Sequence, residues 1–221
     1  FPESRCTVIR SGVDVAAIRR LEVDTMAKKR ELGLEPGRPV VGMVAPMKSQ
    51  KAPLDFVRVA AKVAGKKPET QFLFVGDGDL REAMETEIAR LGLTKSFRLA
   101  GWRRDVPAIM RCLDVFVLTS LWEGLPRVYL EALASGVPIV GTRVDGAAEV
   151  IRDGVNGYLL APGDVQGLAD RVLSLLANPT AAADMGRRGE SLPQEFDIYD
   201  MVRRQEQEYE RLLTGTKHRM S

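Results

Sequence analysis

Short apolar runs alternate with longer stretches of helix-forming residues along most of this chain. An apolar run of about four to eight residues between turn residues is typical of a strand buried on both faces. Because a helical stretch separates each run from the next, we expect strand–helix–strand units and a parallel sheet covered by helices on both faces. The expected strands are Pro39–Ala45, Gln71–Val75, Ser96–Ala100, Val115–Leu118, Val137–Val140 and Tyr158–Leu160.

The stretch Leu121–Gly146 brings two carboxylates close behind an expected strand. Glu123 precedes a Gly-Leu-Pro turn, and Glu131 follows eight residues later on the helix that this turn opens, with Pro126 in the first helical turn. A helix N-terminus offers free N–H groups and the positive end of a dipole, which suit a phosphate. Open α/β sheets bind ligands just beyond their strands. We therefore expect the functional site here.

Composition argues against several classes of function. A net charge of +2 gives no support for a nucleic-acid partner or a membrane surface. Two cysteines make no disulfide framework, which favours a reducing, cytoplasmic compartment. The chain has a single histidine, His218, which argues against a His-based triad and against a zinc site. We expect no metal and no cofactor, and chemistry that uses carboxylates, basic residues and backbone amides.

Two loops that follow expected strands carry further candidates. Lys48 and Lys51 lie after the first strand, although two loop lysines alone are more often simply solvated. Gly76 and Gly78 follow the second strand as a G-x-G pattern. This pattern lacks the third glycine of a dinucleotide fingerprint, so by itself it indicates a tight turn between strand and helix.

The segment after the third expected strand reads Gly-Trp-Arg-Arg-Asp. Trp102 could stack on a flat ligand, although a tryptophan is more often core filler, and Arg103 is by itself more typical of a solvated side chain. Asp105 is a natural N-cap for a helix that we expect to run to about Cys112.

Taken together, these segments resemble the retaining glycosyltransferases of family 4. The shared motifs, in chain order, are K-x-P, V-G-D-G-x-L-R, G-W-x-x-D-V, E-G-x-P-x4-E-A and G-x-P-I-V, between about Val8 and Leu213. That family has the GT-B fold, so the resemblance implies an α/β, Rossmann-like parallel sheet that forms one half of a two-domain fold. This sequence departs from the family at Pro46, where the family has an arginine that holds the donor pyrophosphate. That contact is absent, or Lys48 takes it over.

The resemblance implies a nucleoside-diphosphate sugar donor, carried by UDP, GDP or ADP. Glu131 would accept hydrogen bonds from the ribose hydroxyls, and Lys51, with Lys48, would neutralise the diphosphate. Glu123 would contact the donor sugar and stabilise positive charge at the anomeric carbon in a retaining hexosyl transfer. The other implied donor-binding residues are Gly76, Gly78, Trp102, Arg103, Gly124, Leu125, Pro126, Arg127 and Val128.

The resemblance also divides the chain into segments. We expect an interdomain connector at residues 1–38, with a short strand at Val8–Asp14 and one helix at Ile18–Leu32, and the nucleotide-sugar-binding domain at 39–193. A C-terminal helix at 194–213 precedes a tail at 214–221. In GT-B enzymes such a helix crosses onto the N-terminal domain, so its sparse apolar stripe should be partly uncovered here. The stripe consists of Val202, Tyr209, Leu212 and Leu213.

Acceptor binding belongs to the N-terminal domain of the family, and we find no such domain in this chain, whose first residue is Phe1. We therefore expect a piece of a longer enzyme that binds the donor but transfers little sugar by itself. The whole enzyme would be cytoplasmic or peripheral at the membrane through its other domain. The sequence leaves open the donor base and sugar, the oligomeric state, and whether the acceptor is a glycan, a lipid or a small molecule.

Three other classes remain open at this stage. A sugar-nucleotide epimerase with the GT-B fold would bind the same ligand, although the spacing of Glu123 and Glu131 argues against it. A nicotinamide-dependent oxidoreductase is disfavoured by the incomplete glycine pattern. A non-catalytic α/β interaction module would explain Pro46, but Lys51, Glu123 and Glu131 are all present.

Overall fold

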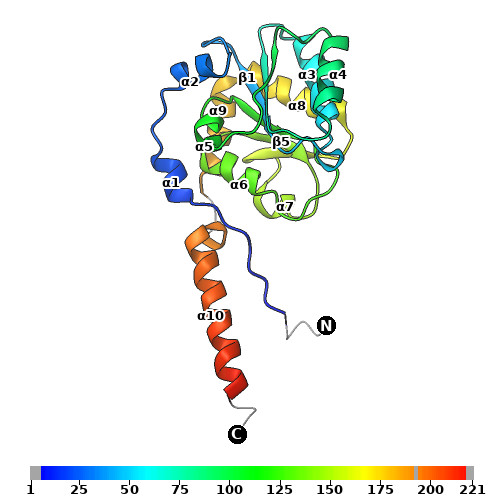
Figure 1. Ribbon diagram of the computed structural model, residues 1–221. Helices are drawn as coiled ribbons and strands as arrows, with labels where there is room; N and C mark the ends of the chain where they lie inside the picture. Colours follow the sequence, from blue (N-terminus) through cyan, green and yellow to red (C-terminus); the bar gives the residue numbers. More distant parts are fainter. Residues whose placement is uncertain (1–5, 192–193, 218–221) are drawn as a thin grey trace.

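The centre of the molecule is a twisted parallel sheet (Figure 1). The computed structural model describes residues 6–191 and 194–217; His218 and the rest of the expected tail beyond Lys217 lie outside this part. Within it, six strands pair in parallel in the order β3-β2-β1-β4-β5-β6, which confirms the predicted fold class. The strands are β1 Val40–Val44, β2 Gln71–Val75, β3 Phe97–Leu99, β4 Val115–Leu118, β5 Ile139–Thr142 and β6 Gly157–Leu160.

The strands form where the sequence is continuously apolar, because both faces of this sheet are covered. Every residue of β2, β4 and β5 is buried. The register pairs Val41 with Phe72 on one side of β1 and with Val115 on the other. β5 begins later than the predicted Val137, since Pro138 has no N–H to donate to a neighbouring strand.

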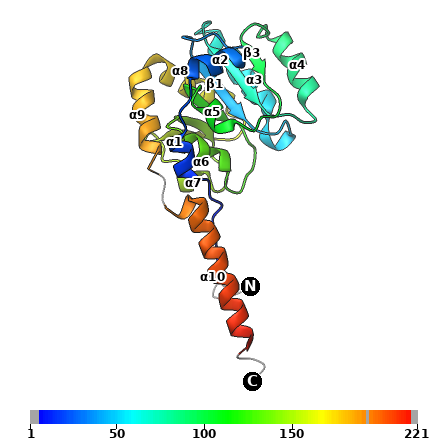
Figure 2. The same cartoon turned by 60° about the vertical axis from the view of Figure 1, so that its left-hand side comes forward.

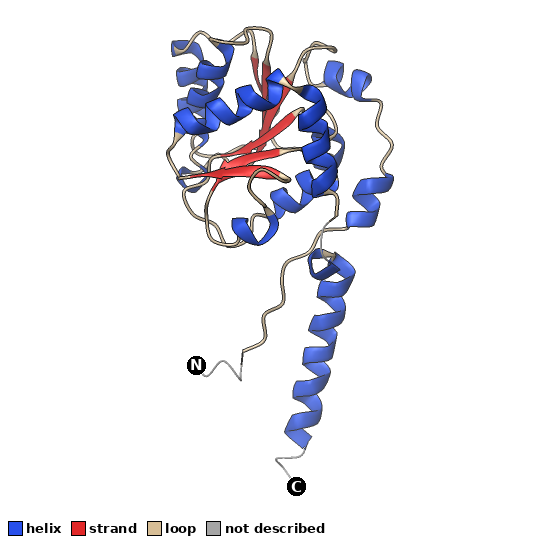
Figure 3. Cartoon of the chain, turned by 180° about the vertical axis from the view of Figure 1, so that it is seen from behind, coloured by secondary structure: helices blue, strands red, loops and turns tan. Residues whose placement is uncertain are grey.

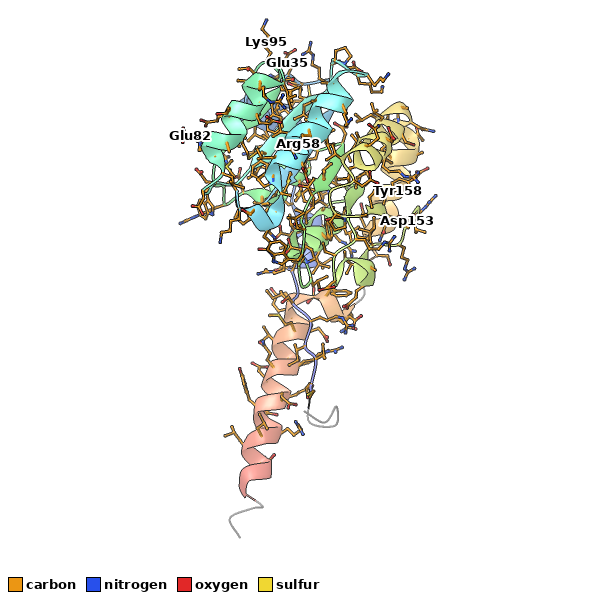
Figure 4. The ribbon with its side chains drawn as sticks, turned by 90° about the vertical axis from the view of Figure 1, so that its right-hand side faces the viewer. Glu35, Arg58, Glu82, Lys95, Asp153 and Tyr158 are labelled. Carbon is orange, nitrogen blue, oxygen red and sulfur yellow. The ribbon has the colours of Figure 1, made fainter. Side chains whose placement is uncertain are left out.

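Helices cover both faces of the sheet, as Figures 1 and 3 show from opposite sides. On one face α3, which carries Arg58, packs against both α4 and α8 (Figure 4). Arg58 reaches Glu87 of α4 at 3.8 Å. On the other face α6 packs against α5 and α7. The helices of the domain are α3 Pro53–Ala64, α4 Arg81–Arg90, α5 Val106–Met110, α6 Arg127–Ala134, α7 Ala147–Val150, α8 Val165–Ala177 and α9 Pro179–Gly189.

The connector differs from the prediction. Instead of one helix at Ile18–Leu32 it forms two, α1 Val15–Arg20 and α2 Thr25–Glu31. The carboxylate of Asp24 accepts a hydrogen bond from the Ala27 amide at 3.0 Å, so it starts a new helix instead of continuing the first. The strand predicted at Val8–Asp14 is also wrong, because only Val13 pairs, in an isolated bridge to Asp197.

The C-terminal helix starts later and ends later than predicted. A 3-10 turn, η3, occupies Gln194–Phe196, and α10 spans Ile198–Lys217. The Asp197 carboxylate accepts a hydrogen bond from the Tyr199 amide at 2.9 Å, so α10 begins after Asp197. α10 projects away from the domain (Figure 2). Its predicted apolar stripe is exposed: Val202 by 41%, Tyr209 by 65%, Leu212 by 54% and Leu213 by 69%.

The strand order places a switch point between β1 and β4. From β1 the chain adds β2 and β3 on one side, and then returns to add β4, β5 and β6 on the other. The loops after β1 and β4 therefore diverge from the same edge of the sheet, which is where such folds bind ligands. Within the described ranges, no helix has the length and apolar character required to cross a membrane.

Candidate functional site

The loops that follow β1 and β4 are bound to each other at the switch point. The amide of Leu121 donates to the carbonyl of Gln50 at 2.8 Å. In return the Gln50 side chain donates from Nε2 to the carbonyl of Trp122 at 2.9 Å. These two hydrogen bonds hold together the segments that carry Lys51 and Glu123.

Lys51 and Glu123 form an ion pair between the two loops, through Lys51 Nζ and Glu123 Oε1. Both side chains are largely shielded from water, with 16% of the lysine and 9% of the glutamate side chain exposed. The Ser120 hydroxyl donates to the same Oε1 at 2.7 Å. The pairing puts a cation and a carboxylate side by side at the predicted junction of diphosphate and donor sugar.

Helix α6 begins directly behind this pair. Pro126 occupies the N-cap position, one residue before the first helical turn in which it was predicted. Tyr129, Leu130 and Leu133 are buried and hold the helix in place, while Gly124 is exposed at the turn. The turn Gly124–Val128 therefore presents a fixed helix N-terminus beside Lys51, an arrangement that suits an anion.

A cavity of about 420 Å³ opens next to the N-terminus of α6. Its volume is within the range of about 300–1,000 Å³ that is common for small-molecule sites. Six of the predicted donor-binding residues line it, namely Gly76, Trp102, Arg103, Arg127, Val128 and Glu131. Lys51, Glu123 and the residues 124–126 do not line this cavity, so the predicted site consists of a cavity and an adjoining charged pair.

Glu131 is half-buried on the wall of the cavity. Burial raises the pKa of its carboxyl, and the positive charge of Arg127 lowers it to a smaller extent. On its other side Glu131 borders a second cavity of about 330 Å³, formed with Val13 and Ile18 of the connector. A partly desolvated carboxylate at this position is suited to accept hydrogen bonds from ligand hydroxyls.

Gly76 and Gly78 have a packing role that the sequence did not indicate. A Cβ on Gly76 would lie 1.9 Å from the carbonyl oxygen of Ala45, and one on Gly78 would lie 2.9 Å from that of Met47. Their φ angles of +139° and +150° are also unfavourable for other residues. Both glycines let the loop after β2 pack against the loop after β1, and Gly76 also lines the cavity.

Trp102 and Arg103 differ in their freedom to reach a ligand. Trp102 is 68% exposed, with the Arg104 guanidinium 5.3 Å from its ring centre. Arg103 is instead held by Asp105, at 2.8 Å from both carboxylate oxygens, and by Glu31 of the connector. Hydrogen bonds from Arg103 lower the pKa of the Asp105 carboxyl.

Asp105 occupies the N-cap position of α5, but its side chain forms no cap hydrogen bond there. The expected capping contact is therefore wrong. The carboxylate is bound instead by Arg103 and by Lys28 of α2, at 3.0 Å from Lys28 Nζ. This ionic cluster attaches the connector to the wall of the cavity.

Of two residues in the loop after β1, Pro46 lines the cavity and Lys48 does not. Pro46, where the motif resemblance predicts an arginine, lines the cavity. Lys48 is exposed and does not line it. A phosphate contact from Lys48 remains a prediction.

Ser120 and Gly146 contribute to the site without having been among the predicted residues. Ser120 lies two residues after the apolar strand β4 and looks like an ordinary loop serine, so only its contact with Glu123 identifies it. A Cβ on Gly146 would lie 2.6 Å from the carbonyl oxygen of Gly124. The glycine lets the start of α7 pack against the turn that carries Glu123.

Replacing Gly146 by alanine should therefore destabilise the fold. The added Cβ would overlap backbone atoms, which cannot move aside as a side chain could, so we expect a loss of about 2 kcal/mol in the free energy of unfolding. Gly124→Ala is the matched control, because a Cβ there meets nothing within 4 Å. Urea denaturation measures both variants. Equal stability of the two would contradict the packing role of Gly146.

Comparison with known proteins places this chain in a protein family. The family model described as "Glycosyl transferases group 1" matches residues 38–178. A UDP-Gal:alpha-D-GlcNAc-diphosphoundecaprenol alpha-1,3-galactosyltransferase from Escherichia coli is 31% identical over 184 residues, which are 78% of this chain and 48% of the relative. A 2-deoxystreptamine glucosyltransferase from Streptomyces kanamyceticus is 31% identical over 93% of this chain and 54% of the relative. The chain thus spans about half the length of these curated relatives.

Solved structures show the same similarity. Anabaena Alr3699/HepE in complex with UDP-glucose superposes with a TM-score of 0.82 at 27% identity, over 90% of this chain and 55% of that one. The C-terminal domain of the LpcC protein from Francisella tularensis superposes with a TM-score of 0.73 at 24% identity. The match covers 86% of this chain and 96% of that domain.

Proposed function

Because this chain belongs to the group 1 glycosyl transferases, we propose that it is the half of such an enzyme that binds a nucleoside-diphosphate sugar. The observation that carries the proposal is the arrangement at the carboxyl edge of the sheet. There the Lys51–Glu123 pair, the N-terminus of α6 and the cavity beside Glu131 adjoin one another. A nucleotide sugar has the same succession of parts: a sugar, a diphosphate and a nucleoside.

Each part of the site fits one part of the donor. Glu131 would bind the ribose hydroxyls, and the exposed ring of Trp102 would face the base at the far side of the cavity. Lys51 and the amides of the turn Gly124–Val128 would bind the diphosphate. Glu123 would bind a hydroxyl of the sugar and stabilise positive charge at the anomeric carbon.

Uracil is the base that we propose. The Escherichia coli relative is named for UDP-Gal, and the Anabaena structures contain UDP or UDP-glucose. Hexosyl transfer with retention of configuration, and membership of family 4, remain predictions from the motif resemblance. The proposed whole enzyme needs no metal, because Lys51 and the α6 amides would balance the charge of the leaving diphosphate.

The acceptor and its domain are proposed partners. The match covers only about half the length of these relatives, and the exposed stripe on α10 is the surface that would contact the enzyme's own N-terminal domain. One relative is named for an acceptor linked to diphosphoundecaprenol, so a lipid-linked glycan is one acceptor class to test. A cytoplasmic enzyme that associates with the membrane through its other domain is compatible with that acceptor.

A thermal-shift titration with UDP, GDP and ADP tests donor binding. A ligand that binds only the folded state at about 100 times its Kd should stabilise the chain by about 2.7 kcal/mol. We expect this for UDP, and expect Glu131→Ala to abolish it. Glu35→Ala is the matched control, since Glu35 precedes β1 and therefore lies at the opposite edge of the sheet (Figure 4). Stabilisation by none of the three nucleotides would contradict the proposal.

An activity assay distinguishes the proposed glycosyltransferase from a sugar-nucleotide epimerase. A sugar-nucleotide epimerase would isomerise UDP-glucose without an acceptor. We expect no such isomerisation, and little transfer to any acceptor by this half alone. Isomerised product in NMR spectra of UDP-glucose incubated with the chain would favour the epimerase.

A further inference from the structure

Two buried hydroxyl groups are bound to the two charged residues of the proposed donor site, one to the backbone of Lys51 and the other to the carboxylate of Glu123. Thr119 and Ser120 directly follow β4 and are exposed by only 1% and 0%. Neither side chain can touch a ligand from this depth. Any effect on the site must pass through the groups to which the two hydroxyls are bound.

The Thr119 hydroxyl holds the end of the loop that carries Lys51. Its Oγ1 lies 2.9 Å from the carbonyl oxygens of both Lys51 and Ala52, so its one proton is shared between them. Ala52 has a φ of +43°, a left-handed conformation that is unfavourable for a residue with a Cβ. The hydroxyl thus stabilises a strained backbone at the point where the Lys51 side chain begins.

The Ser120 hydroxyl holds the carboxylate of Glu123. It donates to Oε1 at 2.7 Å, and Lys51 Nζ pairs with the same oxygen. The carbonyl of Ser120 accepts a hydrogen bond of 2.5 Å from Thr142 Oγ1 on β5, which fixes the serine backbone. Both contacts to Glu123 use Oε1, so neither of them requires Oε2.

We propose that Thr119 and Ser120 are positioning residues, which set the places of the Lys51 ammonium and of the Glu123 carboxylate relative to the donor. This inference rests on the proposed function. Thr119 acts on the diphosphate through Lys51, and Ser120 acts on the sugar through Glu123. Oε2 of Glu123 is the oxygen that is left to accept a hydrogen bond from a sugar hydroxyl.

The two hydroxyls should have different effects on ligand affinity. UDP lacks the hexose that Glu123 would contact, so Ser120→Ala should raise the Kd of UDP-glucose about tenfold and leave that of UDP within about twofold. Thr119→Val keeps the shape of the side chain but removes the donor. Because it disturbs Lys51, it should raise the Kd of both ligands by a similar factor of about ten.

Isothermal titration of the chain with UDP and with UDP-glucose measures these ratios. Ser135→Ala is the matched control, because Ser135 is also buried, at 5% exposed, and its hydroxyl has no hydrogen-bond partner among the described residues. We expect that control to leave both Kd values unchanged. Equal weakening of UDP and UDP-glucose by Ser120→Ala would overturn its assigned role, and so would an equal effect of Ser135→Ala.

A measurement without ligand tests the contact independently of the function. The unfolding equilibrium constants of wild type, Ser120→Ala, Glu123→Ala and the double variant form a double-mutant cycle. We expect the change that Ser120→Ala causes in this constant to differ about tenfold between the chain with Glu123 and the chain with Glu123→Ala. Additive effects would overturn the proposed contact. If the wild-type chain binds neither ligand, the proposed function fails, and the functional part of this inference fails with it. Coupling between the two substitutions in the stability measurement would still show that Ser120 contacts Glu123.

Discussion

Replacing Lys51 by methionine is expected to destabilise the chain by roughly 3 kcal/mol and to weaken UDP binding about a hundredfold. The stability loss arises because the partner carboxylate, Glu123, has only 9% of its side chain exposed and would be left without its counter-charge. The affinity loss arises because the proposed diphosphate site would lose its shielded cation. Urea denaturation measures the first effect and isothermal titration the second.

Two variants separate these effects. In the double variant Lys51→Met/Glu123→Gln no charge is left unpaired, so we expect most of the stability to return while UDP binding stays weak. Lys48→Met removes an exposed lysine from the same loop and should change stability by less than about 0.5 kcal/mol. If Lys48→Met weakens UDP binding as strongly as Lys51→Met, the phosphate contact belongs to Lys48, which would then replace the arginine missing at Pro46.

The sheet was predictable because its strands are buried on both faces. A continuous apolar run such as Gln71–Val75 has few alternatives in a chain of alternating strands and helices, and the structure forms β2 over those same residues. The connector was harder to predict because its composition is helical throughout. What divides it is one carboxylate, Asp24, whose bond to a nearby amide competes with continuation of the helix.

The residues of the site were predictable by type, but their pairing was not. Lys51 and Glu123 stand 72 positions apart, and they meet only because β1 and β4 are neighbours in the sheet. The sequence assigned them to separate ligand groups, a phosphate and a sugar, with no contact between them. Ser120 was missed for a similar reason, since a serine after a strand has no distinctive pattern until its hydroxyl is seen on Glu123.

The ion pair also changes how the proposed donor would be bound. In this structure Lys51 and Glu123 neutralise each other, so a diphosphate that binds Lys51 must share it with a carboxylate of the same sign. The α6 amides can offset that repulsion, because they add positive potential on the ligand side of the pair. The Lys51 charge and the helix N-terminus are therefore best understood as one anion site, and loss of either should weaken the binding of UDP.

Replacing Glu131 by glutamine should change stability and affinity in opposite directions. Burial raises the pKa of the Glu131 carboxyl, so the folded chain retains this proton at a pH where the unfolded chain has lost it. The retained proton stabilises the folded chain. This stabilisation is complete when the pH is below the ordinary pKa of glutamate, about 4.3, and it is lost as the pH rises through the raised pKa of the folded state. At pH 7 the buried charge therefore destabilises the wild-type fold.

Glutamine removes that charge, so we expect Glu131→Gln to be more stable than wild type at pH 7 and equal to it near pH 3. UDP binding should nevertheless weaken by roughly thirtyfold, because the amide offers a neutral acceptor in place of a carboxylate to the ribose hydroxyls. Thermal denaturation at the two pH values, together with titration of UDP at pH 7, measures both effects. A variant that is less stable at pH 7, or that keeps full UDP affinity, would show that Glu131 is a structural residue, and the ribose would then have to be bound by another group in the cavity.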